Sequence, residues 1–213
     1  MAAATWTDPV DRADGYVVGQ TVWNQLLGDT GNEQFLYENS MIPVAVSTSA
    51  NTTTSTVAAD ILTLTPANSI GINDWALLKF EFRKQAVGAA AVAFGLKVNA
   101  TTVIEAQAAS AANVIRSSAT NRAEAGFGSF LIPPRSTANF GFGIIVGDWV
   151  WFTTAGAIAN SKETILAGGT GLVAMAAALP NAAITSVTIR AINETSSNVA
   201  EVHNAGLYVI RNQ

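Results

Sequence analysis

The clearest periodic stretch of the chain begins at Trp75 and alternates apolar and polar residues with the period of a β-strand. The residues that would face a core are Leu78, Phe80 and Phe82. The opposite face would carry Leu77, Lys79, Glu81 and Arg83. After a turn at Gly88, a second stretch of the same period would point Val92, Phe94, Leu96 and Val98 inward. The pattern predicts an antiparallel meander with one buried face and one wetter face.

One turn, a Thr-rich patch and three further strand regions extend this pattern. An asparagine turn at Asn99–Thr101 is expected to lead into a strand at Thr102–Glu105. The Thr-rich patch Asn51–Thr56 is expected to be an exposed loop or an edge hairpin. Further strands are predicted at Ser129–Ile132, which Pro133 ends, and within the aromatic stretch Phe140–Thr153.

The end of the chain predicts two closing strands, Ile184–Ile192 and Gly206–Arg211, around a loop at Asn193–Asn204. The glycines Gly141, Gly143 and Gly147 indicate bulges or close approach of two backbones. About eight to ten strands with no helix between them predict an all-β fold. The expected architecture is an antiparallel, jelly-roll-like β-sandwich over residues 41–213.

Residues 1–40 follow a different pattern and are predicted to be an extended N-terminal attachment arm that contains a short helix. Thr21 can cap this helix, and the apolar residues after it fall on one stripe. A single amphipathic helix cannot bury its stripe alone, so the arm is expected to dock on the domain or on another chain. The predicted interface residues of the arm are Trp6, Pro9, Val22, Trp23, Leu26, Leu27, Phe35 and Leu36.

Charged residues make up only 12% of the 213 residues, while hydrophobic residues reach 49%. This charge content is about half of what soluble domains usually carry. It favours a surface that copies of the chain or a lattice cover, although a robust monomer with an Ala-rich surface is the alternative. The net charge of -4 argues against binding to nucleic acid. The densest basic group, Lys79, Arg83 and Lys84, is interpreted as one solvated strand face.

The sequence offers no candidate catalytic, cofactor-binding or metal-binding residues. With a single histidine, His203, and no cysteine, neither a Cys/His nucleophile pair nor a multi-histidine zinc site can be built. His203 is expected to be an ordinary surface or loop residue. Asp8, Asp11 and Asp14 are spaced by three rather than by the two of a calcium-binding EF-hand loop, so they are interpreted as turn residues. We therefore expect no enzyme and no cofactor.

The sequence also gives no indication of a membrane partner. The first residues lack the basic and apolar regions of a secretory signal, and no apolar run reaches the roughly 20 residues of a membrane span.

Two tryptophans, Trp149 and Trp151, alternate with Val150 and Phe152, so aromatic side chains are expected on both faces of one strand. One face would belong to the core, and the other would be a subunit interface or a platform on which a sugar stacks. Trp149 and Trp151 are therefore possible interface or glycan-platform residues, with core or interface preferred because Trp is usually buried.

Three stretches of the chain carry a resemblance: the closing stretch AAITSVTIRAINETSSNVAEVHNAGLYVIR and the earlier stretches LLKFEFRKQA and GLKVNATT. They are similar to the last strands and to two earlier strands of the β-sandwich virion proteins of tailed bacteriophages. The arm resembles their N-terminal segment through Trp6, Pro9, Gly19, Thr21, Trp23, Asn24 and Leu27. Together these segments cover about half of the chain.

The resemblance implies a non-enzymatic virion protein, commonly a homotrimer, that is made in the cytoplasm of the host bacterium. The preferred hypothesis is a capsid decoration or cementing protein that binds the major capsid protein, or another virion protein, through its arm. The alternative is a tail or fibre protein that attaches to a glycan of the host surface. A polysaccharide-degrading enzyme is a third hypothesis, but no paired carboxylates can be picked out from the spacing of the Asp and Glu residues.

Overall fold

The computed structural model describes residues 42–85, 89–106, 115–117, 119, 123–135, 145–153, 158–165 and 179–210. The predicted arm and its short helix lie outside these residues. Within the described part, every regular element is a β-strand. The strands are β1 (Ile42–Ser47), β2 (Asn51–Thr53), β3 (Ala59–Leu64), β4 (Trp75–Gln85), β5 (Val92–Val98), β6 (Thr101–Ile104), β7 (Ile115–Arg116), β8 (Glu124–Ile132), β9 (Val146–Thr153), β10 (Ile158–Ile165), β11 (Val187–Asn193) and β12 (Val199–Ile210).

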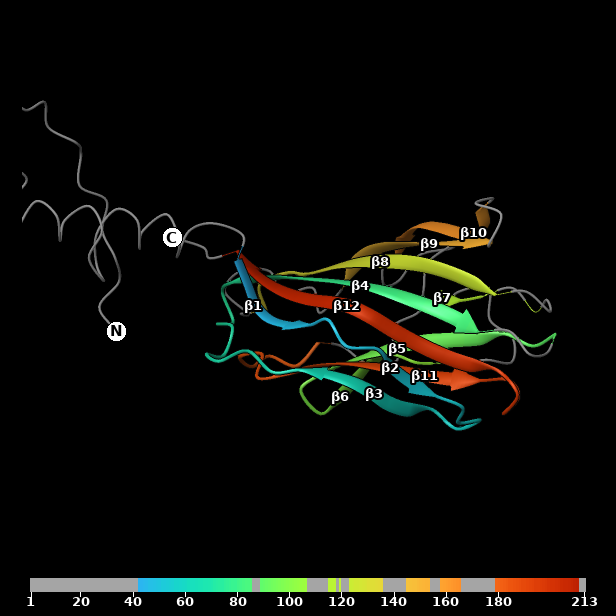
Figure 1. Ribbon diagram of the computed structural model, residues 1–213. Helices are drawn as coiled ribbons and strands as arrows, with labels where there is room; N and C mark the ends of the chain where they lie inside the picture. Colours follow the sequence, from blue (N-terminus) through green and yellow to red (C-terminus); the bar gives the residue numbers. More distant parts are fainter. Residues whose placement is uncertain are drawn as a thin grey trace, which may run out of the picture. The chain divides into compact units, whose positions relative to one another are not determined.

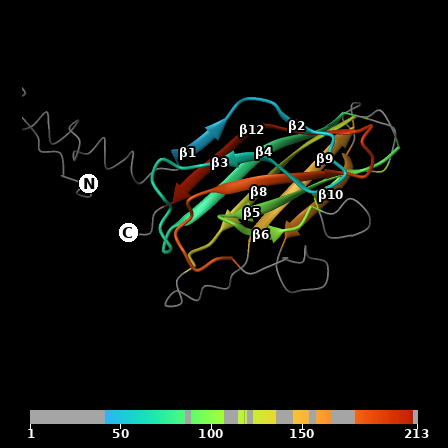
Figure 2. The same cartoon turned by 90° about the horizontal axis from the view of Figure 1, so that it is seen from below.

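The strands form two sheets that face each other (Figures 1 and 2). The seven-stranded sheet has the order β1-β12-β4-β8-β9-β10, and β2 pairs with β12. The five-stranded sheet has the order β3-β11-β5-β6, and β7 pairs with β5. In the seven-stranded sheet β12, β4, β8, β9 and β10 pair antiparallel in succession, as do β3, β11, β5 and β6 in the other sheet. The prediction of an all-β antiparallel sandwich is confirmed, and Pro43–Asn212 form one compact unit.

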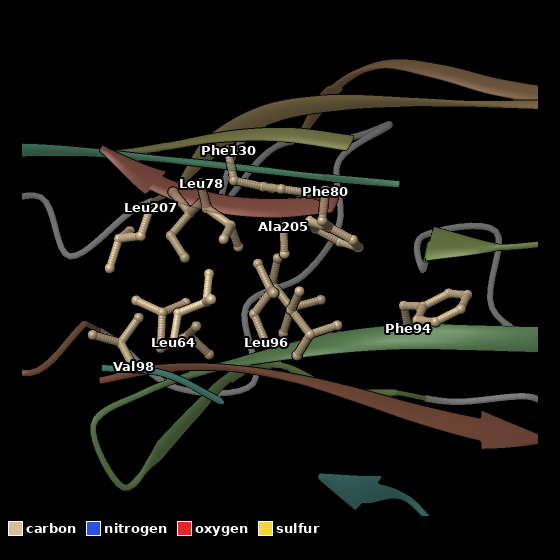
Figure 3. Packing of buried hydrophobic residues seen from close by; sticks show 14 of the residues in the cluster. Leu64, Leu78, Phe80, Phe94, Leu96, Val98, Phe130, Ala205 and Leu207 are labelled. Atoms are coloured by element: carbon tan, nitrogen blue, oxygen red, sulfur yellow. The ribbon is translucent and has the colours of Figure 1, made fainter. Parts of the chain in front are cut away.

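The core lies between the two sheets, and Figure 3 shows side chains from both of them meeting there. Phe80 of β4 stacks on Phe130 of β8 with ring centroids 5.7 Å apart, both within the seven-stranded sheet. Phe82 of β4 packs against Phe94 of β5 with ring centroids 5.3 Å apart, and this pair joins the two sheets. Offset and tilted ring pairs of this kind add stability beyond the area that they bury.

Strand β4 shows the predicted alternation. Leu78, Phe80 and Phe82 are buried, while Lys79 and Arg83 on the other face are exposed. The prediction that Lys84 belongs to the solvated face is wrong, because this lysine is 1% exposed. Its position has the parity of Phe82, and it lies directly across from the buried Glu124 of β8. Desolvation by this burial lowers the pKa of Lys84, while the charge of Glu124 acts in the opposite direction.

Glycines on the inner face of the seven-stranded sheet stand opposite large aromatic residues. Gly128 of β8 pairs with Trp149 of β9, and Gly147 of β9 pairs with Phe130 of β8. A Cβ atom on Gly147 would lie 2.5 Å from the Ser129 carbonyl oxygen and 2.6 Å from the Phe130 ring. Only glycine fits such a close approach, as the sequence predicted for Gly147.

The closing strands differ from the prediction in their bounds. The second closing strand, β12, begins at Val199, so much of the expected loop at Asn193–Asn204 is strand. The reason is a bulge, because the register of β12 against β4 shifts between His203 and Gly206 and Asn204 adopts a positive φ of 40°. Such a bulge interrupts the alternation on which a prediction relies. The asparagine turn is found as expected, with Asn99 at a φ of 54° between β5 and β6.

Candidate functional site

The residues predicted for the arm interface cannot be placed, because Trp6, Pro9, Val22, Trp23, Leu26, Leu27, Phe35 and Leu36 all lie outside the described residues. Their role stays a prediction. The same holds for the division of the chain at residue 40.

Trp149 packs inside the sandwich. It is 2% exposed and belongs to the core cluster, so its ring is not open to a ligand in this chain. Its indole Nε1 has no hydrogen-bond partner among the described residues. The side chain of Trp151 lies outside what the structure describes, and its backbone pairs with Gly126 of β8. A role of Trp151 at an interface or on a glycan platform stays a prediction.

A different pair of aromatic side chains is open to solvent, on the outer face of the seven-stranded sheet. Phe127 of β8 is 56% exposed, and its ring centroid lies 5.8 Å from that of Phe152 of β9. Both have the parity opposite to that of the core residues of their strands. Phe127 is the aromatic one of the three large apolar side chains that are exposed among the described residues, and Phe152 beside it is partly buried. An apolar surface of this kind makes the face a candidate for interaction.

The two rings form the wall of an open hollow with a volume of about 170 Å³. Ala125 of β8 pairs with Arg83 of β4 on one side and with Phe152 of β9 on the other. Its small side chain leaves space between these two larger ones. Phe127 follows two positions along β8, and Glu81 of β4 is its partner across the ladder. The hollow therefore lies over Ala125, with two aromatic rings, a guanidinium and a carboxylate around it.

The polar groups beside the hollow differ in how they are satisfied. The Glu81 carboxylate accepts a hydrogen bond from Asn204 Nδ2 through Oε2, at 2.9 Å. The Arg83 side chain is exposed and makes no hydrogen bond or ion pair with another described residue. The residue across from Arg83 on β12 is Glu201, but this carboxylate accepts a hydrogen bond from Gln85 and lies against the imidazole of His203. Among the described residues, none occupies the donors of Arg83.

His203 lies in strand β12 and not in a loop, which corrects the sequence prediction. Its Nε2 lies next to the Glu201 carboxylate without the geometry of a hydrogen bond, and the two form an ion pair only when the imidazole is protonated. Its side chain is 20% exposed. The charged side chains around it on the outer face are two cations, Lys79 and Arg83, and two anions, Glu81 and Glu201.

The outer face of the five-stranded sheet holds charged groups that satisfy one another. Arg190 of β11 donates from Nε to Asp60 Oδ1 at 2.9 Å and from Nη1 to Glu105 Oε1 at 3.3 Å. Lys97 of β5 donates from Nζ to the other oxygen of Asp60 at 2.7 Å. The hydrogen bond from Lys97, together with the charge and the hydrogen bond of Arg190, holds the pKa of Asp60 below its ordinary value although burial opposes this.

Within the described ranges, no group of three or more His, Cys, Asp or Glu side chains is arranged to hold a metal ion. Over the same residues, no helix is long and apolar enough to cross a membrane.

Sequence reasoning missed the hollow although part of its signal was present. Phe127 stands between two glycines at a position whose parity puts it on the outer face, and Phe152 was expected on the face opposite Trp151. What the sequence does not contain is the register that sets Phe152 and Arg83 on either side of Ala125.

Comparisons with known proteins assign no family. No protein-family model matches the chain, and no curated protein matches it either. Among solved structures, the chain is similar to a legume lectin-like domain from Entamoeba histolytica, at 6% identity and a TM-score of 0.34 over 83% of this chain and 92% of that one. It is also similar to the potassium-bound carbohydrate recognition domain of Emp46p, at 11% identity and a TM-score of 0.25 over 68% of this chain and 76% of that one.

A third likeness is to a protein of unknown function with a galectin-like fold from Bacillus subtilis, at 6% identity and a TM-score of 0.24 over 78% of this chain and 90% of that one. TM-scores this low assign neither a fold family nor a ligand to the chain.

Proposed function

We propose that the chain is a non-enzymatic structural protein of a tailed-phage virion, a capsid decoration protein that anchors by residues 1–40 and displays the β-sandwich. Its expected partners are the major capsid protein, or another virion protein, and two further copies of itself in a homotrimer. Its expected place is the virion, after synthesis in the cytoplasm of the host bacterium.

The observation that carries the proposal is the order of the strands. Apart from the short β2 and β7 and the added hairpin β9–β10, eight strands remain. When these eight strands are renumbered 1 to 8 along the chain, the order β1-β12-β4-β8 becomes 1-8-3-6 and the order β3-β11-β5-β6 becomes 2-7-4-5. This order supports a jelly roll, a double-sheet fold that capsid proteins use and that lectins share. Because one fold hosts many functions, the order favours a virion protein only together with the resemblance of the closing strands.

The outer face of the seven-stranded sheet adds support for a protein that is covered by neighbours. Leu77, Leu131 and Tyr208 lie on this face and are only partly buried within the chain. Apolar groups left half-open on a sheet face favour contact with another protein surface.

Binding to empty capsids of the phage tests the proposal. We expect the full chain to bind, and we expect the full-length variant Trp23→Ala/Leu27→Ala to bind at least about tenfold more weakly, because truncating a tryptophan anchor commonly removes more than about 2 kcal/mol. Light scattering should report a trimer for both proteins. Val57→Ala is the matched control, since Val57 is a 73% exposed apolar residue outside the arm.

Equal binding of the arm variant and the full chain would show that the arm is not the anchor. If the full chain fails to bind capsids, the decoration hypothesis is wrong. Binding to host cells in its place would favour the second candidate, a tail or fibre adhesin. The hollow between Phe127 and Phe152 is the observation that favours this second candidate.

A further inference from the structure

We propose that the hollow over Ala125 is a carbohydrate-binding site that takes one pyranose ring. This inference goes beyond the decoration function and does not rest on it, because it depends only on the outer face of β4, β8 and β9.

The aromatic wall provides the apolar half of such a site. A pyranose presents a face of C–H groups, which carry small positive charges, and an aromatic ring presents a negative face. The Phe127 and Phe152 rings, at 5.8 Å and an interplanar angle of 34°, form an angled wall rather than a closed stack. Phe127 remains 56% exposed, so its ring has surface left for a ligand.

The polar wall provides the other half. Sugar hydroxyls both donate and accept hydrogen bonds, so a site that holds a sugar needs acceptors and donors within the width of one ring. Glu81 is an acceptor whose position the hydrogen bond from Asn204 fixes. Arg83, two residues along β4, supplies donors that are not used by any described residue. It can donate to a hydroxyl, to the ring oxygen or to a carboxylate substituent.

The size of the hollow and the charges beside it favour a small ligand at this point. The hollow has a volume of about 170 Å³, which leaves room for one ring. Glu81 and Arg83 line the hollow, and charged groups are depleted from the cores of protein interfaces. A small ligand that needs both polar and apolar contacts matches this arrangement better.

The test uses the full chain on an array of neutral, N-acetylated and acidic pyranosides, followed by titration of the best ligand. Ala125→Leu is the decisive variant, because a leucine would fill the hollow from an exposed position without removing any contact of the fold. We expect it to weaken binding at least about tenfold, and Phe127→Ala to do the same through loss of the stacking surface. Arg83→Gln should weaken binding less, and Val57→Ala should leave it unchanged.

Thermal unfolding of each variant shows whether it is folded. The proposal is overturned if no pyranoside binds the full chain, or if Ala125→Leu is folded and binds as tightly as the parent. It is overturned equally if Ala125→Leu changes capsid binding or self-association while no sugar binds, because the face would then be a protein interface. The two proposals can also fail separately. If the parent chain binds a sugar, Ala125→Leu abolishes that binding, and the parent does not bind capsids, the sugar site is supported and only the decoration function is wrong.

Discussion

The outer faces of the two sheets differ in how their arginines are used. On the five-stranded sheet, Arg190 is held by Asp60, Glu105 and the carbonyl of Ala58, and its side chain is 16% exposed. On the seven-stranded sheet, Arg83 stands beside two phenylalanine rings and is held by no described residue. The arginine of the five-stranded sheet is thus held by the chain's own hydrogen bonds, whereas Arg83 has no such partner among the described residues.

This difference indicates where a partner can bind. A ligand on the five-stranded sheet would have to compete with hydrogen bonds that the chain already makes, and the free energy gained would be small. A ligand on the seven-stranded sheet meets the donors of Arg83, which no described residue occupies, and the exposed ring of Phe127. The seven-stranded sheet is therefore the face to which we assign binding.

The largest expected effect on the free energy of unfolding is a difference between substitutions on the inner and the outer side of strand β8. Gly126→Val should lower the free energy of unfolding by about 3 kcal/mol, because a Cβ atom there would collide with the Val150 carbonyl oxygen and the Phe82 ring. Ala125→Leu, one residue earlier on the open side, should change it by less than about 0.5 kcal/mol. Urea unfolding of both variants measures the difference. Equal destabilisation would mean that the outer side of β8 is packed after all.

The next largest expected effect is a difference in the free energy of unfolding between variants of the two arginines. Arg190→Met removes four hydrogen bonds, to Asp60, Thr102, Glu105 and the Ala58 carbonyl. We expect it to lower the free energy of unfolding by about 2 kcal/mol, because hydrogen bonds between charged groups contribute more than neutral ones. Arg83→Met is the matched control and should stay within about 0.5 kcal/mol of the parent. A loss in Arg83→Met as large as that in Arg190→Met would contradict the open face.

The smallest effect depends on pH. The folded pKa of Asp60 lies below its ordinary value of 3.8, so its carboxylate stabilises the fold above that pH and loses this contribution as the pH falls through the lowered folded pKa. We expect Asp60→Asn to be less stable than the parent by at most about 1 kcal/mol near neutral pH, since the group is partly exposed. The gap should close in acid, below the folded pKa. Chemical denaturation at several pH values measures it, and a gap that persists unchanged in strong acid would exclude Asp60 as its source.

Much of the fold could be predicted because strands carry a local signal. The alternation in Trp75–Gln85 identified the buried side of β4, and Asn99 marked the turn between β5 and β6. Strands β3 (Ala59–Leu64) and β10 (Ile158–Ile165) were missed, because their residues show no clean period of two and they are held by pairing with β11 and β9. Lys84 was misassigned because it was grouped by charge with Lys79 and Arg83 rather than by its place in the alternation.

The sequence by itself determined the fold class and the inner faces of β4 and β5, because the side to which a strand residue points follows from its neighbours in the chain. It also determined that His203 has no second histidine or cysteine with which to build a catalytic pair. Only the tertiary structure decided that Arg83, Ala125 and Phe152 lie side by side, and that Arg190 is hydrogen-bonded while Arg83 has no partner among the described residues. The physical reason is register, since the pairing of distant strands is set by the packing of the whole core and not by any one segment.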